Sequence, residues 1–162
     1  MEVIIFEDNK SEDLFPLNML RASFDIKCGT GSIKDRIVKI LNGKHEVLLV
    51  CRETISGLMK EINKEKVNQL PKGDALFLNG RVVFGKDLLN KIIKEKKKDH
   101  IYTYKDELIS AYLSPDKTKE FKNFFDEAGS KDLNFKEYFE SNKFTEFEIP
   151  ESGDLFLLKY PW

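Results

Sequence analysis

Short apolar runs alternate with stretches of helical periodicity through the first hundred residues of this chain. The runs are rich in Val, Ile, Leu and Phe, which is typical of buried strands. The stretches between them place apolar residues at helical spacing, as Ile37, Ile40 and Leu41 do. Strands that alternate with helices predict a largely parallel sheet with right-handed crossover connections.

The pattern continues to the C-terminus, where it becomes mixed. Strands are predicted at residues 3–6, 45–51, 75–78, 101–104, 108–113, 144–149 and 155–158. Helices are predicted at residues 32–42, 53–64, 86–96 and 133–139, and from Ser114 to a stop at Gly129. The predicted fold class is therefore α/β: a Rossmann-like, mostly parallel sheet with flanking helices and some antiparallel strands in the second half.

The dipeptide Asn79-Gly80 allows two interpretations. Asn-Gly between apolar runs is the strongest short signal for a β-hairpin, and residues 82–84 would then form the return strand. The same residues could instead form a ligand loop at the end of a strand. The two interpretations are compatible, because a turn can present Asn79 and Arg81 to a ligand.

Composition limits the classes of function. The formal net charge is -1, which argues against a general nucleic-acid binder. No apolar run approaches the roughly 20 residues of a membrane span, and the N-terminus lacks the basic start of a signal peptide. Cys28 and Cys51 form no metal motif. We therefore expect one domain over residues 1–162 in a reduced, cytoplasmic setting, without a membrane or nucleic-acid partner; a homo-oligomer is left open.

The segment from residue 21 to residue 36 is dense in groups that bind anions. Arg21 offers a planar, permanently charged fork that suits phosphate, and Lys27 is a second cation. Asp25 lies between them and can hold either one in place. Gly29 allows a sharp turn or a close approach of the backbone to a ligand, and Ser32 is a good N-cap for the predicted helix.

Three interpretations of this segment remain open. A helix start attracts phosphate, so the segment can be a phosphate-handling loop that enters a helix. It can also be an ordinary capped helix with two surface cations. In the third interpretation, these residues form a structural salt-bridge network around Asp25.

The order and spacing of these residues indicate a resemblance to a known family. The residues that carry it are Phe15-Pro16-Leu17, Arg21, Asp25, Lys27, Gly29, Ser32, Asp35 and Arg36, with Phe6 to Asn9 and Leu76 to Arg81. This string resembles a signature of sugar nucleotidyltransferases, a family similar to the uridylyltransferase half of bifunctional N-acetylglucosamine-1-phosphate uridylyltransferase and glucosamine-1-phosphate acetyltransferase. In longer relatives, a Pro-Trp pair like Pro161-Trp162 precedes a left-handed β-helix.

The resemblance implies a nucleotide-diphospho-sugar transferase fold and transfer of a nucleotidyl group from a nucleoside triphosphate to a sugar 1-phosphate, as in the synthesis of cell-envelope precursors. It places Arg21 and Lys27 near the pyrophosphate leaving group, oriented by Asp25, with Arg36 as a weaker candidate. Chemistry of this kind depends on alignment and on charge stabilisation.

The same resemblance implies a set of substrate contacts and Mg²⁺ as cofactor. The implied contacts are Asp8, Gly29, Ser32, Arg36, Asn79, Gly80 and Arg81. Within this set, Asp8 could hold Mg²⁺, Asn79 would contact the nucleotide or sugar, and Arg81 would contact a phosphate.

Two departures support an alternative function. The better-known pyrophosphorylases carry a glycine-rich loop after the first strand, whereas this chain has acidic residues 7–13 there. They also carry a Gly-Asp pair whose Asp binds Mg²⁺, and the corresponding pair here is Gly80-Arg81. The alternative is a catalytically inactive nucleotide-sugar-binding or assembly domain of the same fold.

Overall fold

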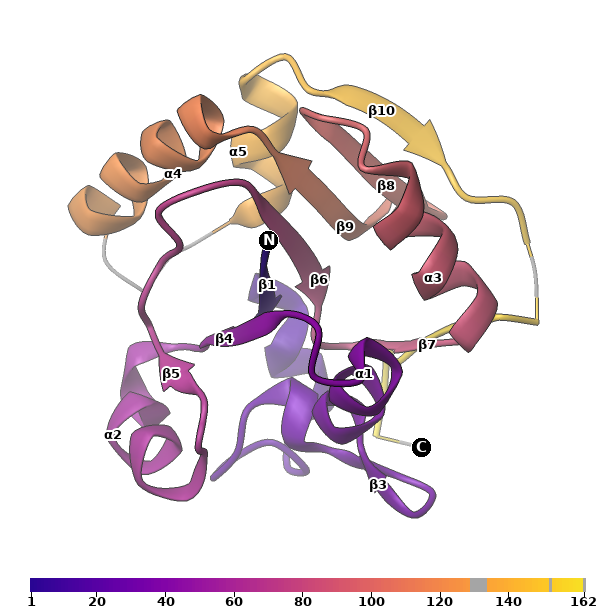
Figure 1. The fold of residues 1–162 in the computed structure, drawn as a ribbon. Helices are drawn as coiled ribbons and strands as arrows, with labels where there is room; N and C mark the ends of the chain where they lie inside the picture. The colour runs from indigo at the N-terminus through magenta and orange to yellow at the C-terminus, as the bar shows by residue number, and fades with distance from the viewer. Residues whose placement is uncertain (129–133, 152, 162) are drawn as a thin grey trace.

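A seven-stranded sheet forms the centre of the molecule. The computed structural model of the chain describes residues 1–128, 134–151 and 153–161 (Figure 1). In spatial order the strands are β10 (Thr145–Glu148), β8 (His100–Tyr104), β9 (Glu107–Leu113), β6 (Ala75–Asn79), β1 (Glu2–Phe6), β4 (Glu46–Val50) and β5 (Lys66–Val67).

The strand directions confirm the predicted fold class. β1 is parallel to both β4 and β6, and β4 is parallel to β5. β9 runs antiparallel to β6 and to β8, and β10 is parallel to β8. The sheet is therefore mostly parallel, with the antiparallel strand in the second half of the chain.

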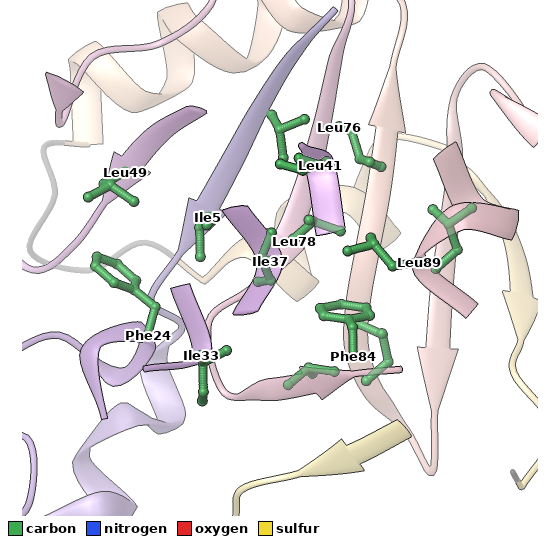
Figure 2. Close-up of a cluster of buried hydrophobic side chains, with 14 of the residues drawn as sticks. Ile5, Phe24, Ile33, Ile37, Leu41, Leu49, Leu76, Leu78, Phe84 and Leu89 are labelled. Carbon is green, nitrogen blue, oxygen red and sulfur yellow. The ribbon is translucent and has the colours of Figure 1, made fainter. Parts of the chain in front are cut away.

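Alternate residues of β1 face two separate apolar layers. Val3 and Ile5 face α1 (Ile33–Leu41), α2 (Glu53–Ile62) and α3 (Lys86–Glu95). Figure 2 shows part of this first layer. Ile4 and Phe6 face α4 (Pro115–Ala128) and α5 (Phe135–Ser141) on the opposite side of the sheet. This arrangement follows from the two-residue side-chain period of a strand buried on both faces.

The predicted helices agree with the structure to within a few residues. α1, α2 and α3 fall inside the predicted ranges of 32–42, 53–64 and 86–96. The predicted stop at Gly129 and the predicted start of the last helix at residue 133 lie outside the described residues. In the described ranges, no helix is long and apolar enough to cross a bilayer.

The predicted hairpin at Asn79-Gly80 is wrong. β7 (Val82–Phe84) leaves the main sheet and pairs antiparallel with β11 (Leu155–Leu157), which lies near the C-terminus. The physical reason is that both edges of β6 are occupied, one by β1 and the other by β9. A return strand has no free edge to pair with.

Several short elements were not predicted from the sequence. They are the 3-10 helices η1 (Asn9–Leu14) and η2 (Ser23–Asp25), the strands β2 (Lys27–Cys28) and β3 (Gly31–Ser32), and β5. β2 and β3 pair with each other as a small antiparallel ribbon directly before α1. The segment of anion-binding groups at residues 21–36 therefore contains a helical turn and a ribbon.

The second apolar layer is built from aromatic rings around Phe121. This ring is fully buried and lies 5.0 Å from the Phe77 ring and 5.7 Å from the Phe139 ring, centroid to centroid. Phe121→Ala should lower the free energy of unfolding by about 3–5 kcal/mol, because the cavity it leaves cannot close. Chemical denaturation measures this change.

Phe156→Ala is the matched control, because this ring is 63% exposed. We expect this substitution to change the free energy of unfolding by at most about 0.5 kcal/mol. Equal effects at the two positions would contradict the placement of α4 over the sheet.

Candidate functional site

Arg81 is almost completely buried although it is charged, at 1% exposure. Its Nε donates to Asp8 Oδ1 over 2.7 Å, and one terminal nitrogen donates to Asp8 Oδ2 over 2.6 Å. The same nitrogen lies 3.2 Å from Glu107 Oε2, and the other terminal nitrogen donates to the Leu158 carbonyl over 2.9 Å. The guanidinium is thus used within the protein as a structural ion pair, and the predicted phosphate contact of Arg81 stays a prediction.

Asn79 and Gly80 belong to the same structural network. The side-chain amide of Asn79 donates to Asp8 and to the Leu108 carbonyl, each over 2.8 Å, and its oxygen accepts the Arg81 backbone N–H. A Cβ on Gly80 would lie 2.9 Å from the Phe6 carbonyl oxygen and from the Phe24 Cβ. Asn79 therefore orders the end of β6, and Gly80 allows two segments to pack closely; their predicted substrate contacts stay predictions.

The Asp8 carboxylate already has partners within the protein. Both of its carboxylate oxygens accept hydrogen bonds from the Arg81 guanidinium, and one also accepts from Asn79. Mg²⁺ at Asp8 would have to compete with these donors for the carboxylate oxygens. Across residues 1–128, 134–151 and 153–161, no group of three or more His, Cys, Asp or Glu side chains could hold a metal ion.

Asp25 pairs with residues outside the predicted set. Its carboxylate lies 3.5 Å from the Lys34 ammonium, and the Asn63 amide donates to it over 3.4 Å. Burial raises the pKa of the Asp25 carboxyl, and the Lys34 charge opposes that rise. The predicted orientation of Arg21 or Lys27 by Asp25 is therefore corrected: the cation that Asp25 holds is Lys34.

Arg21 and Lys27 are both exposed, and neither is among the residues that line the cavities described below. Their described neighbours differ. The Arg21 carbonyl accepts a 3.4 Å hydrogen bond from the Arg52 guanidinium. Lys27 lies in β2, paired with Ser32 of β3. Arg21 thus lies beside Arg52, whereas Lys27 belongs to the ribbon.

Ser32 begins α1 with a complete capping box. Its Oγ accepts the Asp35 backbone N–H over 3.0 Å, and Asp35 Oδ2 accepts the Ser32 N–H over 2.9 Å. Gly29 has a positive φ of 80° at the turn of the ribbon. Arg36 donates from Nε to the Phe84 carbonyl over 3.2 Å. Ser32 and Gly29 therefore have local structural roles, and Arg36 ties α1 to β7.

A cavity of about 540 Å³ lies at the carboxyl ends of β1 and β4. One wall is the segment after β1, including Glu7, Asp8 and Glu12, and another is the β4–α2 connection from Val50 to Thr54. Asn134 and Phe135, at the start of α5, also line it. Ligands of open α/β sheets bind at this edge, so this cavity is the candidate functional site.

Arg52 is the cation in the wall of this cavity, and the sequence interpretation missed it. Its guanidinium pairs with Glu7, contacts the Asn18 carbonyl and lies 5.9 Å from the centre of the Phe15 ring. The available signal was position: Arg52 directly follows a buried strand and precedes a helix. Strand-end cations of this kind face the ligand edge of an α/β sheet.

Glu7 holds Arg52 in place. Its carboxylate accepts the backbone N–H of Ser23 over 3.0 Å and that of Arg52 over 3.2 Å, in addition to the guanidinium. Burial raises the pKa of the Glu7 carboxyl, and the positive charge of Arg52 opposes this effect. The pair joins the ends of β1 and β4 beneath the cavity.

Comparison with known proteins places the chain in a family. Residues 3–162 match the family described as sugar nucleotidyl transferase. The chain belongs to this family. Among curated proteins, no sequence matches it.

Solved structures share the fold of this sugar nucleotidyl transferase family member. The inositol-1-phosphate CTP transferase from T. maritima aligns with a TM-score of 0.62 at 9% identity, over 99% of this chain and 89% of that chain. The CTP:phosphocholine cytidylyltransferase from Streptococcus pneumoniae aligns with a TM-score of 0.55 at 10% identity, over 98% and 93%. At such low identity, these likenesses show the fold.

The buried Arg81 ion pair predicts a large effect on stability. Arg81→Ala should lower the free energy of unfolding by about 3–5 kcal/mol, because Asp8 loses its cation and, in the described structure, keeps only the Asn79 amide, and Glu107 keeps only the half-exposed Lys10. Urea unfolding measures the change. Arg21→Ala, at an exposed arginine, should stay within about 0.5 kcal/mol. If Arg81→Ala stays stable but binds phosphate more weakly, Arg81 contacts the ligand as predicted from the sequence.

The capping box predicts a pH dependence. The Ser32 backbone N–H holds the pKa of the Asp35 carboxyl below its usual value. A lowered pKa adds stability above the unfolded-state value of about 3.9, and that stability is lost as pH falls through the folded-state pKa. Asp35→Ala should therefore cost about 1 kcal/mol at pH 7 and progressively less in acid.

Asp87→Ala is the control for Asp35→Ala, because Asp87 also lies in a first helical turn but forms no capping box in the described structure. We expect a smaller, helix-dipole effect of about 0.3 kcal/mol there. Denaturation at several pH values compares the two variants. An Asp35→Ala deficit that stays constant from pH 7 to pH 2 would rule out the charged cap.

Proposed function

We propose that this chain transfers a nucleotidyl group from a nucleoside triphosphate to a sugar 1-phosphate, in the cavity at the carboxyl ends of β1 and β4. The observation that carries the proposal is the position of Arg52, in the wall of a 540 Å³ cavity at the ligand edge of the sheet. Family membership supports nucleotidyl transfer in general. The sugar 1-phosphate substrate follows from the resemblance in residues 15–36.

In the proposed reaction, an oxygen of the sugar phosphate attacks the α-phosphorus of the triphosphate. The bond from the α-phosphorus to the bridging oxygen breaks, and pyrophosphate leaves with the negative charge. The Arg52 guanidinium and the first backbone N–H groups of α2, which begins at the cavity wall, would stabilise this charge. Glu7 would keep the guanidinium in place throughout.

Arg21 would supply a second cation at the rim. Its carbonyl already lies 3.4 Å from the Arg52 guanidinium, and its side chain is exposed. Because the exposed side chain is long and flexible, it could reach a phosphate in the cavity. Mg²⁺ is proposed as the ion that enters with the nucleotide phosphates, since such sites bind it mainly through phosphate oxygens.

The alternative function is nucleotide-sugar binding without catalysis. One observation favours it: the cavity lining contains the carboxylates of Glu7, Asp8, Glu12 and Glu53 beside Arg52. Arg52 is itself paired with Glu7. A triphosphate without bound cations meets a mostly negative wall, which weakens its binding.

Pyrophosphate release tests the proposal. The chain is incubated with a panel of nucleoside triphosphates and sugar 1-phosphates in the presence of Mg²⁺. We expect release with at least one pair, and a drop of about tenfold or more in Arg52→Lys, which keeps the charge opposite Glu7 but loses the planar fork. Lys60→Arg, at an exposed site on α2, is the control, because it also substitutes one basic side chain for another.

Two further measurements decide between the functions. Thermal unfolding of Arg52→Lys separates a lost contact from a lost fold. If no pair in the panel releases pyrophosphate and calorimetry detects binding of a nucleotide sugar, the function is binding without catalysis. Arg21→Ala should weaken ligand binding without unfolding the domain; unchanged affinity would remove Arg21 from the site.

A further inference from the structure

A second hollow, of about 550 Å³, lies between the end of α1 and one face of α3. Its lining includes four lysines, Lys39, Lys44, Lys86 and Lys94, and contains no Asp or Glu. His45, which also lines it, directly precedes β4. The hollow therefore lies near the amino end of β4, whereas the candidate site lies at the carboxyl end.

The four lysines are not neutralised by neighbouring carboxylates. Elsewhere in the molecule, Lys34, Lys66 and Lys136 form ion pairs with Asp or Glu. In the described part of the chain, none of the four around the hollow lies within 4.0 Å of a carboxylate. Like charges gathered around one concave surface attract anions strongly.

Helix stabilisation explains only part of this charge. Lys39 and Lys94 lie in the last turns of α1 and α3, where cations interact favourably with the helix dipole. Lys86 is the first residue of α3, where a cation is unfavourable, and Gly85 provides no side-chain cap. Asp87 in the same turn offsets part of this cost, and an anion bound in the hollow would offset more of it, because Lys86 lines the hollow.

The spacing of the lysines suits a ligand with more than one charge. Lys86 and Lys94 both line the hollow from α3, eight residues apart, which is about 12 Å along the helix axis. Ile40, Leu41 and Ile93 add an apolar part to the same lining. A ligand that fits both parts carries several negative charges and an uncharged body.

We propose that this hollow binds an organic diphosphate, with its phosphates held by the lysines and its uncharged portion against Ile40, Leu41 and Ile93. Lysine is a common phosphate ligand that acts as a point charge. The volume falls within the range of small-molecule sites, about 300–1,000 Å³. This second site is independent of the proposed transferase activity, because no residue lines both cavities.

His45 provides a local reporter. Burial lowers the pKa of the His45 imidazole, and the charges of the N-terminal amino group, Lys96 and Lys44 lower it further. A bound diphosphate places negative charge beside the ring and favours the protonated form, so the pKa should rise. By linkage, the diphosphate should bind more tightly as pH falls through the pKa of His45.

The test follows the imidazole proton signal of His45 by NMR while ADP is added. The chain contains two histidines, so His100→Gln assigns the signal. We expect a saturable shift and a pKa that rises toward or above the ordinary value of about 6.5. Lys86→Gln combined with Lys94→Gln should weaken binding by about tenfold or more. Lys60→Gln combined with Lys122→Gln removes the same charge from exposed positions and should change it little.

Three outcomes would overturn the proposal. ADP that binds without moving the His45 signal occupies another site. Equal weakening by the two double variants means general charge attraction in place of a site. Inorganic pyrophosphate tests the apolar wall, and it should bind more weakly than ADP. Equal affinity would mean that the uncharged portion of the ligand makes no contact with this wall.

Discussion

The buried ion pair between Arg81 and Asp8 joins four separate parts of the chain. Asp8 follows β1, Arg81 follows β6, Glu107 begins β9, and Leu158 follows β11. A guanidinium at 1% exposure is stable only when its donors are matched by acceptors, so these four segments must meet in one arrangement. The geometry of the strand ends depends on this one interaction.

The ion pair also decides where a ligand can bind. The chain passes from β1 to β4 on one side and from β6 toward β9 on the other, so its connections diverge between β1 and β6. Ligands of open α/β sheets bind at such a point. Here the Arg81–Asp8 pair fills it, and the cavity beside β9 measures only about 150 Å³. The larger space, of about 540 Å³, lies beside β4, where Arg52 stands.

The sequence predicted the features that depend on local patterns and missed those that depend on distant partners. Strand and helix periodicity placed β6 and α1, and the Ser32 cap follows from residues three positions apart. The pairing of β7 with β11 joins segments more than 70 residues apart, as Val82 and Leu157 show, so no local pattern reveals it. The structural ion pair of Arg81 was missed for the same reason. Its partner Asp8 is 73 positions away, and the local sequence Gly80-Arg81 is the same whether the arginine pairs with a carboxylate or binds a phosphate.

The two cavities differ in the sign of the charges that line them, and this difference selects which form of a phosphate compound each one attracts. Carboxylates dominate the lining of the β1–β4 cavity, whereas lysines line the hollow between α1 and α3. On the two proposals, a phosphate compound whose charge is covered by divalent cations would enter the first, because the cations would face the carboxylates. The same compound without cations would be repelled there and attracted to the second. With a net charge of only -1, the protein creates this contrast by separating its charges, and the long-range part of the contrast weakens with salt beyond a screening length of about 8–10 Å.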